Sequence, residues 1–218
     1  MKSRFGVLSN ATKVESKRLT TILIFKLFET KNSLYFYDEC TFSLNDFKKK
    51  YWQAAESCEV LHLRNPCLRI KLNVIMSIDR VVAFQISLDN HKQEDVEEFV
   101  STVMCDLSRS SYSTNVKYLM LDNNPKNRSN KLFRLASDKK FGLFFITPGT
   151  PEHNMAESFF GFLKHVYCTL RNLDRINQAA DSQFEALLVV LESMRRVNAE
   201  FFSRIRRTFL YELQKTLI

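Results

Sequence analysis

The stretch that decides the fold runs from Val116 to Lys164 and reads VKYLMLDNNPKNRSNKLFRLASDKKFGLFFITPGTPEHNMAESFFGFLK. Its first apolar run is typical of a buried β-strand and ends on Asp122. A segment with helical spacing and a second short apolar run, residues 143–146, follow. The next segment leads into an amphipathic helix, and Glu157 lies in the first turn of that helix. One carboxylate thus ends a strand, and a second carboxylate begins a helix.

A third carboxylate ends an earlier strand-like run. The apolar residues 34–37 lead directly into Asp38-Glu39. Mg²⁺ prefers carboxylate oxygens, and two such ions about 4 Å apart hold the attacking and leaving oxygens of a displacement at phosphorus. Such a site needs acids that are distant in sequence but adjacent on a rigid platform. Asp38 and Asp122 on neighbouring strands, with Glu157 on a helix beside them, would meet that need.

Each acid also has a purely structural explanation. Asp38-Glu39 is compatible with a strand-end turn, and Asp122-Asn123 is compatible with an Asx turn. Asn154 is a good N-cap candidate, which would place Glu157 at the third helical position, as one half of a capping arrangement. The coincidence of three acids, each at the end of the right kind of element, favours the two-metal site.

Composition and charge indicate a globular protein with a polyanionic partner. The 218 residues are 45% apolar and 26% charged, which suits one large domain or one domain with helical appendages. The formal net charge is +8, and the excess of basic residues lies in residues 1–50 and 164–218, around a neutral centre. Basic flanks of this kind suit nucleic acid, although a merely soluble basic surface has the same pattern.

Cysteine usage and hydropathy point to an intracellular protein. The five Cys residues are scattered and never form Cys-x-x-Cys, and the four His residues do not cluster with them. This pattern indicates reduced thiols and argues against a structural zinc site. No apolar run is long enough to span a bilayer, and the N-terminus has no signal-peptide core, so we expect no membrane partner.

The remaining periodicity predicts a mixed α/β sheet covered by helices. The expected elements upstream of the deciding stretch are a basic amphipathic helix over 13–30, a strand over 33–38, a hairpin of 68–76 with 80–88, and a core helix over 92–107. After Glu157 the chain is expected to be helical to its end. The helix expected over 174–194 has an apolar face of Ile176, Phe184, Leu187, Leu188 and Leu191, and another helix is expected over 198–218.

Three motifs in this chain resemble those of one family. Tyr37-Asp38-Glu39, followed by an aromatic at Phe42, is similar to the first-strand motif of mariner-type and related insertion-sequence transposases, and Leu121-Asp122-Asn123 is similar to their second motif. The third and most specific motif is the run 148–157, PGTPEHNMAE, which continues to Lys164. The interval between the last two acids is a spacing that this group uses. The chain therefore resembles the catalytic domain of a DDE-superfamily transposase from about residue 10 to beyond 200.

The resemblance implies a fold, an activity and a cofactor. The fold would be RNase H-like, with 1–30 as a basic helix or linker, 31–172 as the catalytic domain and 173–218 as a helical C-terminal extension. Asp38, Asp122 and Glu157 would form the catalytic and metal-binding triad for Mg²⁺ or Mn²⁺, with two ions. The activity would be DNA strand cleavage and strand transfer, with transposon ends and target DNA as partners. The resemblance is also compatible with a homodimer. It implies a protein of the nucleus in a eukaryote, or otherwise of the cytoplasm.

Three departures from the family pattern qualify this expectation. Met155 stands where the family usually has Pro, and no His follows Asp122 within a few residues. Residues 1–37 are too short for the paired helix-turn-helix modules that recognise transposon ends, so we expect a catalytic domain without its DNA reader. The alternative is a catalytically silent, transposase-derived relic that binds DNA. An RNA–DNA hybrid ribonuclease is disfavoured, because Thr-Pro-x-x-Asn before the Glu is not expected there.

Basic and aromatic residues outside the triad are weaker candidates for contact with DNA. A phosphate contact suits Lys and Arg, and base stacking suits Trp. A solvated loop or helix face explains the same residues about as well. The candidates are Lys48, Lys49, Lys50, Trp52, Lys164, Arg204, Arg206 and Arg207.

Overall fold

The computed structural model describes residues 10–29, 33–43, 69–88, 92–109, 116–176 and 183–217. Its centre is a five-stranded sheet with the strand order β3-β2-β1-β4-β5. The strands are β1 (Ser33–Ser43), β2 (Arg69–Ser77), β3 (Val81–Ser87), β4 (Lys117–Leu121) and β5 (Phe141–Phe145). β1 pairs antiparallel with β2 and parallel with β4, and β4 pairs parallel with β5, so the sheet is mixed as the sequence predicted.

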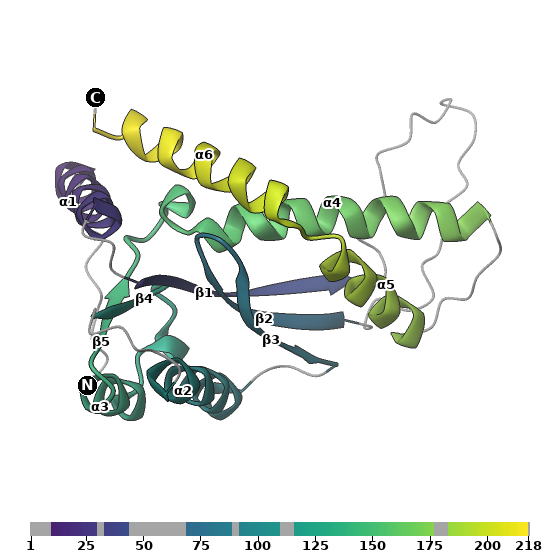
Figure 1. Ribbon diagram of the computed structural model, residues 1–218, viewed down its shortest axis with the longest axis horizontal. Coiled ribbons are helices and arrows are strands. Elements are labelled where there is room, and N and C mark those ends of the chain that lie inside the picture. Colours follow the sequence, from purple (N-terminus) through teal and green to yellow (C-terminus); the bar gives the residue numbers. More distant parts are fainter. Residues whose placement is uncertain are drawn as a thin grey trace.

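Helices cover both faces of this sheet (Figure 1). The helices are α1 (Asn10–Glu29), α2 (Gln93–Arg109), α3 (Asn130–Asp138), α4 (Met155–Ile176), α5 (Gln183–Arg195) and α6 (Ala199–Lys215), with two short 3₁₀ turns, η1 (Pro125–Asn127) and η2 (Pro151–His153). Helices α2 and α3 pack on one face, and α1, α4, α5 and α6 pack on the other. This three-layer arrangement confirms the expected RNase H-like α/β fold.

Successive side chains of β1 alternate between the two hydrophobic cores on the opposite faces of the sheet. Phe36 points to the core of the α4 face, where its ring meets that of Phe209 at 5.4 Å. Tyr37 points to the opposite core, where its ring meets Phe99 of α2 at 6.3 Å. Because successive side chains of a strand point to opposite faces, Asp38 follows Phe36 and lies on the α4 face of the sheet. Burial on both faces makes β1 a rigid platform for this acid.

Most of the expected elements are confirmed, with shifts at their ends. The predicted hairpin is β2–β3, and the predicted core helix is α2, whose buried face is the one expected from its sequence. The first strand is longer than expected, because β2 pairs with it as far as Ser43. Among the described residues, no helix is both long and apolar enough to cross a membrane.

The helix expected over 174–194 is wrong in both its limits and its face. α4 continues to Ile176, and a separate helix, α5, begins at Gln183. The buried apolar residues of α5 are Ala186, Val189 and Val190, and Ser193 is buried with them, whereas three of the expected core residues are exposed, namely Phe184, Leu188 and Leu191. The buried residues follow helical spacing too, and smaller side chains allow the helix to lie close to the sheet.

Candidate metal centre

Strand pairing brings Asp38 and Asp122 together. The last pair of the parallel β1–β4 ladder is Phe36 with Met120. Asp38 and Asp122 each lie two residues beyond that pair, and they therefore project from the same face of neighbouring strands. The place where this parallel ladder ends lies at the carboxyl edge of the parallel strands, which is where ligands of α/β folds bind. β1 itself continues to Ser43 in its antiparallel pairing with β2, so Asp38 lies within the strand, and the prediction that it ends the strand is wrong.

The loop before α4 brings the third acid to the same edge. Asn154 lies immediately before α4, and its side-chain oxygen accepts the backbone N–H of Ala156 at 3.1 Å. Glu157 is the third residue of the helix, as predicted, and its N–H donates to the backbone oxygen of Asn154 at 3.1 Å. The side-chain Nδ2 of Asn154 donates to Asp38 Oδ2 at 2.9 Å. One amide therefore caps the helix that carries Glu157 and binds the acid of β1.

The carboxylates of this edge repel one another. Burial, opposed by a hydrogen bond from the Glu39 backbone N–H and reinforced by the charges of Glu157, Asp122 and Glu39, raises the pKa of Asp38 to about 7. Burial also raises the pKa of Asp122, although N–H groups of Asn124 and Asn127 donate to that carboxylate. Within the described residues, no Lys or Arg forms an ion pair with Asp38, Asp122 or Glu157. The site is therefore anionic and has no counterion from those residues.

A cleft of about 540 Å³ opens over two of these acids. Its lining includes Asp122, Asn154 and Glu157, together with residues 147–151. Asp38 does not line the cleft but is hydrogen-bonded to Asn154, which does. The cleft therefore gives a phosphodiester access to Asp122 and Glu157.

The donor set fits a hard divalent cation. Mg²⁺ keeps several waters and is usually bound by one or two carboxylates together with substrate phosphates. Nowhere in the described part of the chain do three His, Cys, Asp or Glu side chains form a group that would hold an ion by itself. Asp38 and Asp122 would supply the two carboxylates that Mg²⁺ usually takes, and Glu157 would supply a third oxygen donor.

The candidate DNA contacts are only partly visible. Lys48, Lys49, Lys50 and Trp52 lie outside the described residues. Lys164 is exposed on α4, two turns after Glu157 and therefore on the same side of the helix. On α6, Arg204, Arg206 and Arg207 are all exposed, and Arg206 lies 3.6 Å from Asp79. The contacts of these residues with DNA stay predictions.

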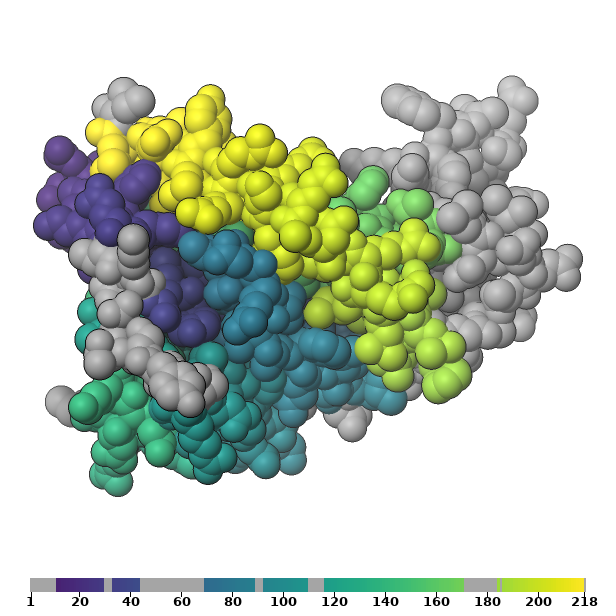
Figure 2. All heavy atoms as spheres, viewed as in Figure 1, coloured from purple at the N-terminus to yellow at the C-terminus, as the bar shows by residue number. Residues whose placement is uncertain are grey.

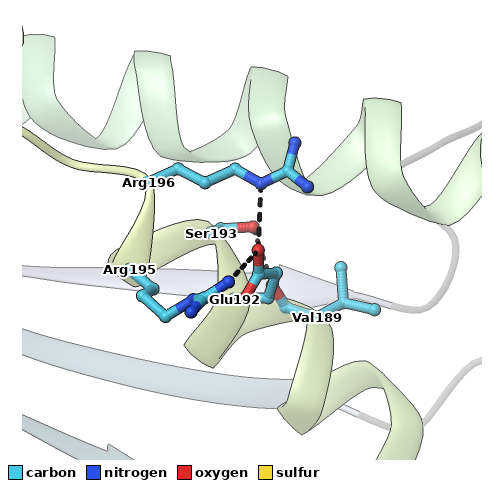
Figure 3. A network of polar contacts seen from close by, with 5 residues as sticks. All are labelled: Val189, Glu192, Ser193, Arg195 and Arg196. Atoms are coloured by element: carbon cyan, nitrogen blue, oxygen red, sulfur yellow. Dashed lines mark hydrogen bonds and ion pairs between the residues drawn. The ribbon is translucent and has the colours of Figure 1, made fainter.

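Two neighbouring arginines share one carboxylate. Arg195 and Arg196 both donate to Glu192, at 2.9 and 3.1 Å (Figure 3). Ser193 beside them is buried and donates to the backbone oxygen of Val189 at 2.7 Å. Arg204 and Arg207, in contrast, have no ion-pair partner within the described residues. Arg204 and Arg207 of α6 are therefore the arginines of this region whose charge no described carboxylate pairs with.

Sequence reasoning missed the second role of Asn154 and the role of Asn127. Asn154 was expected to cap the helix, but no sequence pattern reports that its Nδ2 reaches Asp38 across 116 positions. Asn127 is buried in η1, and its side-chain amide donates to the Asp122 carboxylate. Its position five residues after Asp122, beyond a Pro, is the one sequence signal that a turn would bring it back.

Comparison with known structures gives the same architecture. The chain superposes on the Mos1 transposase catalytic domain, in a structure with raltegravir and Mg, with a TM-score of 0.68 at 12% identity. This match covers 97% of the present chain and 96% of the Mos1 catalytic domain. It superposes on a Mos1 paired-end complex with the left transposon end with a TM-score of 0.70 at 13% identity, and on the mariner Mos1 paired-end complex with Mg with a TM-score of 0.71 at 14% identity.

These matches cover different shares of the Mos1 chains. The chain is covered completely by the two Mos1 complexes but spans 64% and 66% of those transposase chains. Among curated proteins, none matches the chain significantly. The family model described as "DDE superfamily endonuclease" matches residues 33–178, which contain all three acids, the whole described sheet and helices α2, α3 and α4. The chain therefore belongs to the DDE superfamily endonuclease family.

Proposed function

We propose that this chain is the catalytic domain of a DDE transposase that cleaves DNA strands and joins them to a target in the presence of Mg²⁺ or Mn²⁺. The observation that carries the proposal is the meeting of Asp38 and Asp122 at one sheet edge, with Asn154 tying Asp38 to the helix of Glu157. The mutual repulsion of the carboxylates favours a cation between them. The Mos1 structures with Mg and with transposon ends support the choice of cofactor and substrate.

Each residue has a separate task in this proposal. Asp38 and Asp122 would bind the cations from the sheet, and Glu157 would complete the shell of one of them. Bound divalent ions supply Lewis-acid stabilisation of the attacking and leaving oxygens at phosphorus. Asn154 would orient Asp38 through the 2.9 Å hydrogen bond, and Asn127 would orient Asp122. These fixed amides keep the carboxylates from turning away when the substrate enters.

The proposal extends to organisation and partners. The catalytic domain would span 31–172, with 1–30 as its N-terminal helical part and 173–218 as its C-terminal extension. Transposon ends and target DNA would be its substrates, and a homodimer would bring two ends together. A eukaryotic chain would act in the nucleus, and a bacterial chain in the cytoplasm.

The experiment is nicking of supercoiled plasmid by the wild type and by Asp122→Ala in Mn²⁺ and in EDTA. The proposal expects nicking that needs Mn²⁺ and disappears in the variant. DNA binding of both proteins is measured in parallel across a series of salt concentrations. Absence of nicking in the wild type, with salt-sensitive DNA binding unchanged in Asp122→Ala, would support the silent DNA-binding relic instead.

A further inference from the structure

Helix α1 is joined to the loop that carries the third acid by a set of polar contacts. This loop, residues 146–157, is called the Glu157 loop below. The contacts are Ser16 Oγ with Thr147 Oγ1 at 3.0 Å, Thr20 Oγ1 with Thr147 Oγ1 at 3.2 Å, Thr21 Oγ1 with His153 Nε2 at 2.9 Å, and an ion pair between Lys17 and Glu152. Thr147 itself lines the cleft over the acids. Four residues within two turns of α1 thus meet the loop of the proposed metal centre.

The contact between Thr21 and His153 is the buried member of this set. Both residues are fully buried, with 0% of each exposed. Thr21 Oγ1 also lies 3.0 Å from the backbone oxygen of Lys17, to which its hydroxyl donates. A hydroxyl has one proton, so the Thr21 oxygen must accept the hydrogen bond from His153. The imidazole therefore carries its proton on Nε2.

The other ring nitrogen agrees with this assignment. His153 Nδ1 is buried and has no hydrogen-bond partner among the described residues. An unprotonated nitrogen leaves only a lone pair unused there, whereas a buried N–H without an acceptor would cost more. Burial, partly offset by the charge of Glu152, lowers the pKa of His153, in keeping with a neutral ring. Thr21 is then the single described group that satisfies the polar hydrogen of this ring.

The ring is one residue away from the amide that holds Asp38. His153 ends η2, its N–H donates to the backbone oxygen of Thr150 at 3.0 Å, and the N–H of Asn154 donates to that of Pro151 at 2.9 Å. A ring that shifted would therefore displace this turn and the Asn154 side chain with it. The end of α1 that follows Thr21 is packed in turn, because the ring of Phe28 lies 6.2 Å from that of Phe209 on α6. Figure 2 shows the purple segment, α1, lying against the yellow segment, α6.

We infer that Thr21 and His153 are positioning residues that set the geometry of the metal centre from helix α1. Thr21 fixes the Nε2–H tautomer and the place of His153, and His153 in turn fixes the turn from which Asn154 reaches Asp38. This inference rests on the proposed function, because it assigns the pair to the same metal site. Neither side chain is expected to touch metal or DNA.

The test compares Thr21→Val, which keeps the size of the side chain but removes the acceptor oxygen, with Thr21→Ser, which keeps the oxygen. Thr208→Val is the matched control, because Thr208 is an exposed helical Thr that also donates to a backbone oxygen four residues back. Mn²⁺ binding to each DNA-free protein is measured by calorimetry, and the Mn²⁺ concentration for half-maximal nicking is measured on plasmid. We expect Thr21→Val to raise the dissociation constant for Mn²⁺ and the Mn²⁺ concentration for half-maximal nicking by about tenfold each. In Thr21→Ser and Thr208→Val, both values should stay within about twofold of those of the wild type.

A folded Thr21→Val protein that binds Mn²⁺ as tightly as the wild type would overturn the inference. If Thr21→Val does not fold, the ¹⁵N spectrum of the wild-type imidazoles decides: an Nε2–H tautomer for His153 supports the inference, and an Nδ1–H tautomer overturns it. A wild type that binds Mn²⁺ but nicks nothing defeats the proposed activity alone, and the comparison of Val with Ser still decides the positioning role. A wild type that binds no Mn²⁺ defeats both.

Discussion

The side-chain amide of Asn154 joins two elements of the proposed metal centre, because its Nδ2 donates to Asp38 Oδ2 at 2.9 Å while its Oδ1 accepts the N–H of Ala156 at 3.1 Å. Asn154→Ser separates these two roles, since Ser caps a helix as well as Asn does but does not reach Asp38. We expect a loss of unfolding free energy of about 1 kcal/mol and a weaker affinity for Mn²⁺. Thermal unfolding and calorimetry measure the two effects. An unchanged Mn²⁺ affinity would show that Asp38 needs no orientation by Asn154.

The acidity of Asp38 should appear in the stability of the metal-free chain. Its pKa rises from the ordinary 3.8 to about 7 in the folded state, mainly through burial. The folded protein then binds the proton more tightly than the unfolded chain does, so stability is full below pH 4 and is lost as the pH rises through 7. Asp38→Asn removes this titration while keeping an oxygen acceptor for Asn154. The variant should therefore be more stable than the wild type at pH 8 by roughly 1–3 kcal/mol, and equally stable near pH 4.

Thermal unfolding in EDTA at the two pH values checks this prediction. Asp106→Asn is a suitable control, because Asp106 is exposed on α2 and lies 3.9 Å from Arg109. A variant at position 38 that is less stable than the wild type at pH 8 would contradict the account, since it would mean that the Asp38 charge stabilises the metal-free fold.

The close approach of β4 and β5 predicts a steric effect. A Cβ on Gly142 would lie 2.4 Å from Cδ1 of Tyr118, whose ring packs 5.5 Å from that of Phe144. Gly142→Ala should therefore destabilise the protein by about 1–3 kcal/mol, as overpacking does. Gly161→Ala is the control, because a Cβ there meets nothing within 4 Å on helix α4. It should stabilise the helix by about 0.5–1 kcal/mol. Equal melting temperatures for the two variants would refute the packing argument.

The arginines should differ in their effect on DNA binding. Arg204→Ala and Arg207→Ala each remove an exposed charge without an ion-pair partner among the described residues, whereas Arg195→Ala removes one that donates to Glu192. If α6 contacts phosphates, each of the first two variants should weaken binding at all DNA sequences and lower the salt slope by about 0.9. Arg195→Ala should have little effect. Identical slopes for all variants would exclude α6 from the DNA interface.

The sequence predicted the elements whose periodicity is strong and local. The acids in the first turns of α2 and its apolar face predicted both the helix and its buried residues, which are those observed. Asn154 was recognisable as an N-cap, because capping is a contact between residues two or three apart. Asp122 and Glu157 were recognisable at the ends of their elements, whereas Asp38 was expected to end a strand and lies within β1, because pairing with β2 extends that strand to Ser43. The structure brings the elements that carry the three acids together.

Contacts between residues distant in sequence could not be predicted, for a physical reason. In α5, large and small apolar residues alternate around the helix, and packing against the sheet selected Ala186, Val189 and Val190 over Phe184 and Leu188. The hydrogen bond between Thr21 and His153 spans 132 positions. His153 lies in the third motif, but Thr21 lies in none, so no local pattern indicates that the two residues meet. Tertiary packing decides such contacts, and a single sequence has no local signal for them.

The most direct test of the central claim is Mn²⁺ binding by the wild type and by Asp38→Asn, Asp122→Asn and Glu157→Gln, each measured by calorimetry without DNA. The control is Asp106→Asn, an exposed acid on the other face of the sheet. The account predicts that each of the three variants binds Mn²⁺ at least tenfold more weakly than the wild type, and that the control binds equally well. Wild-type affinity in all three variants would contradict the claim that these carboxylates form one metal centre.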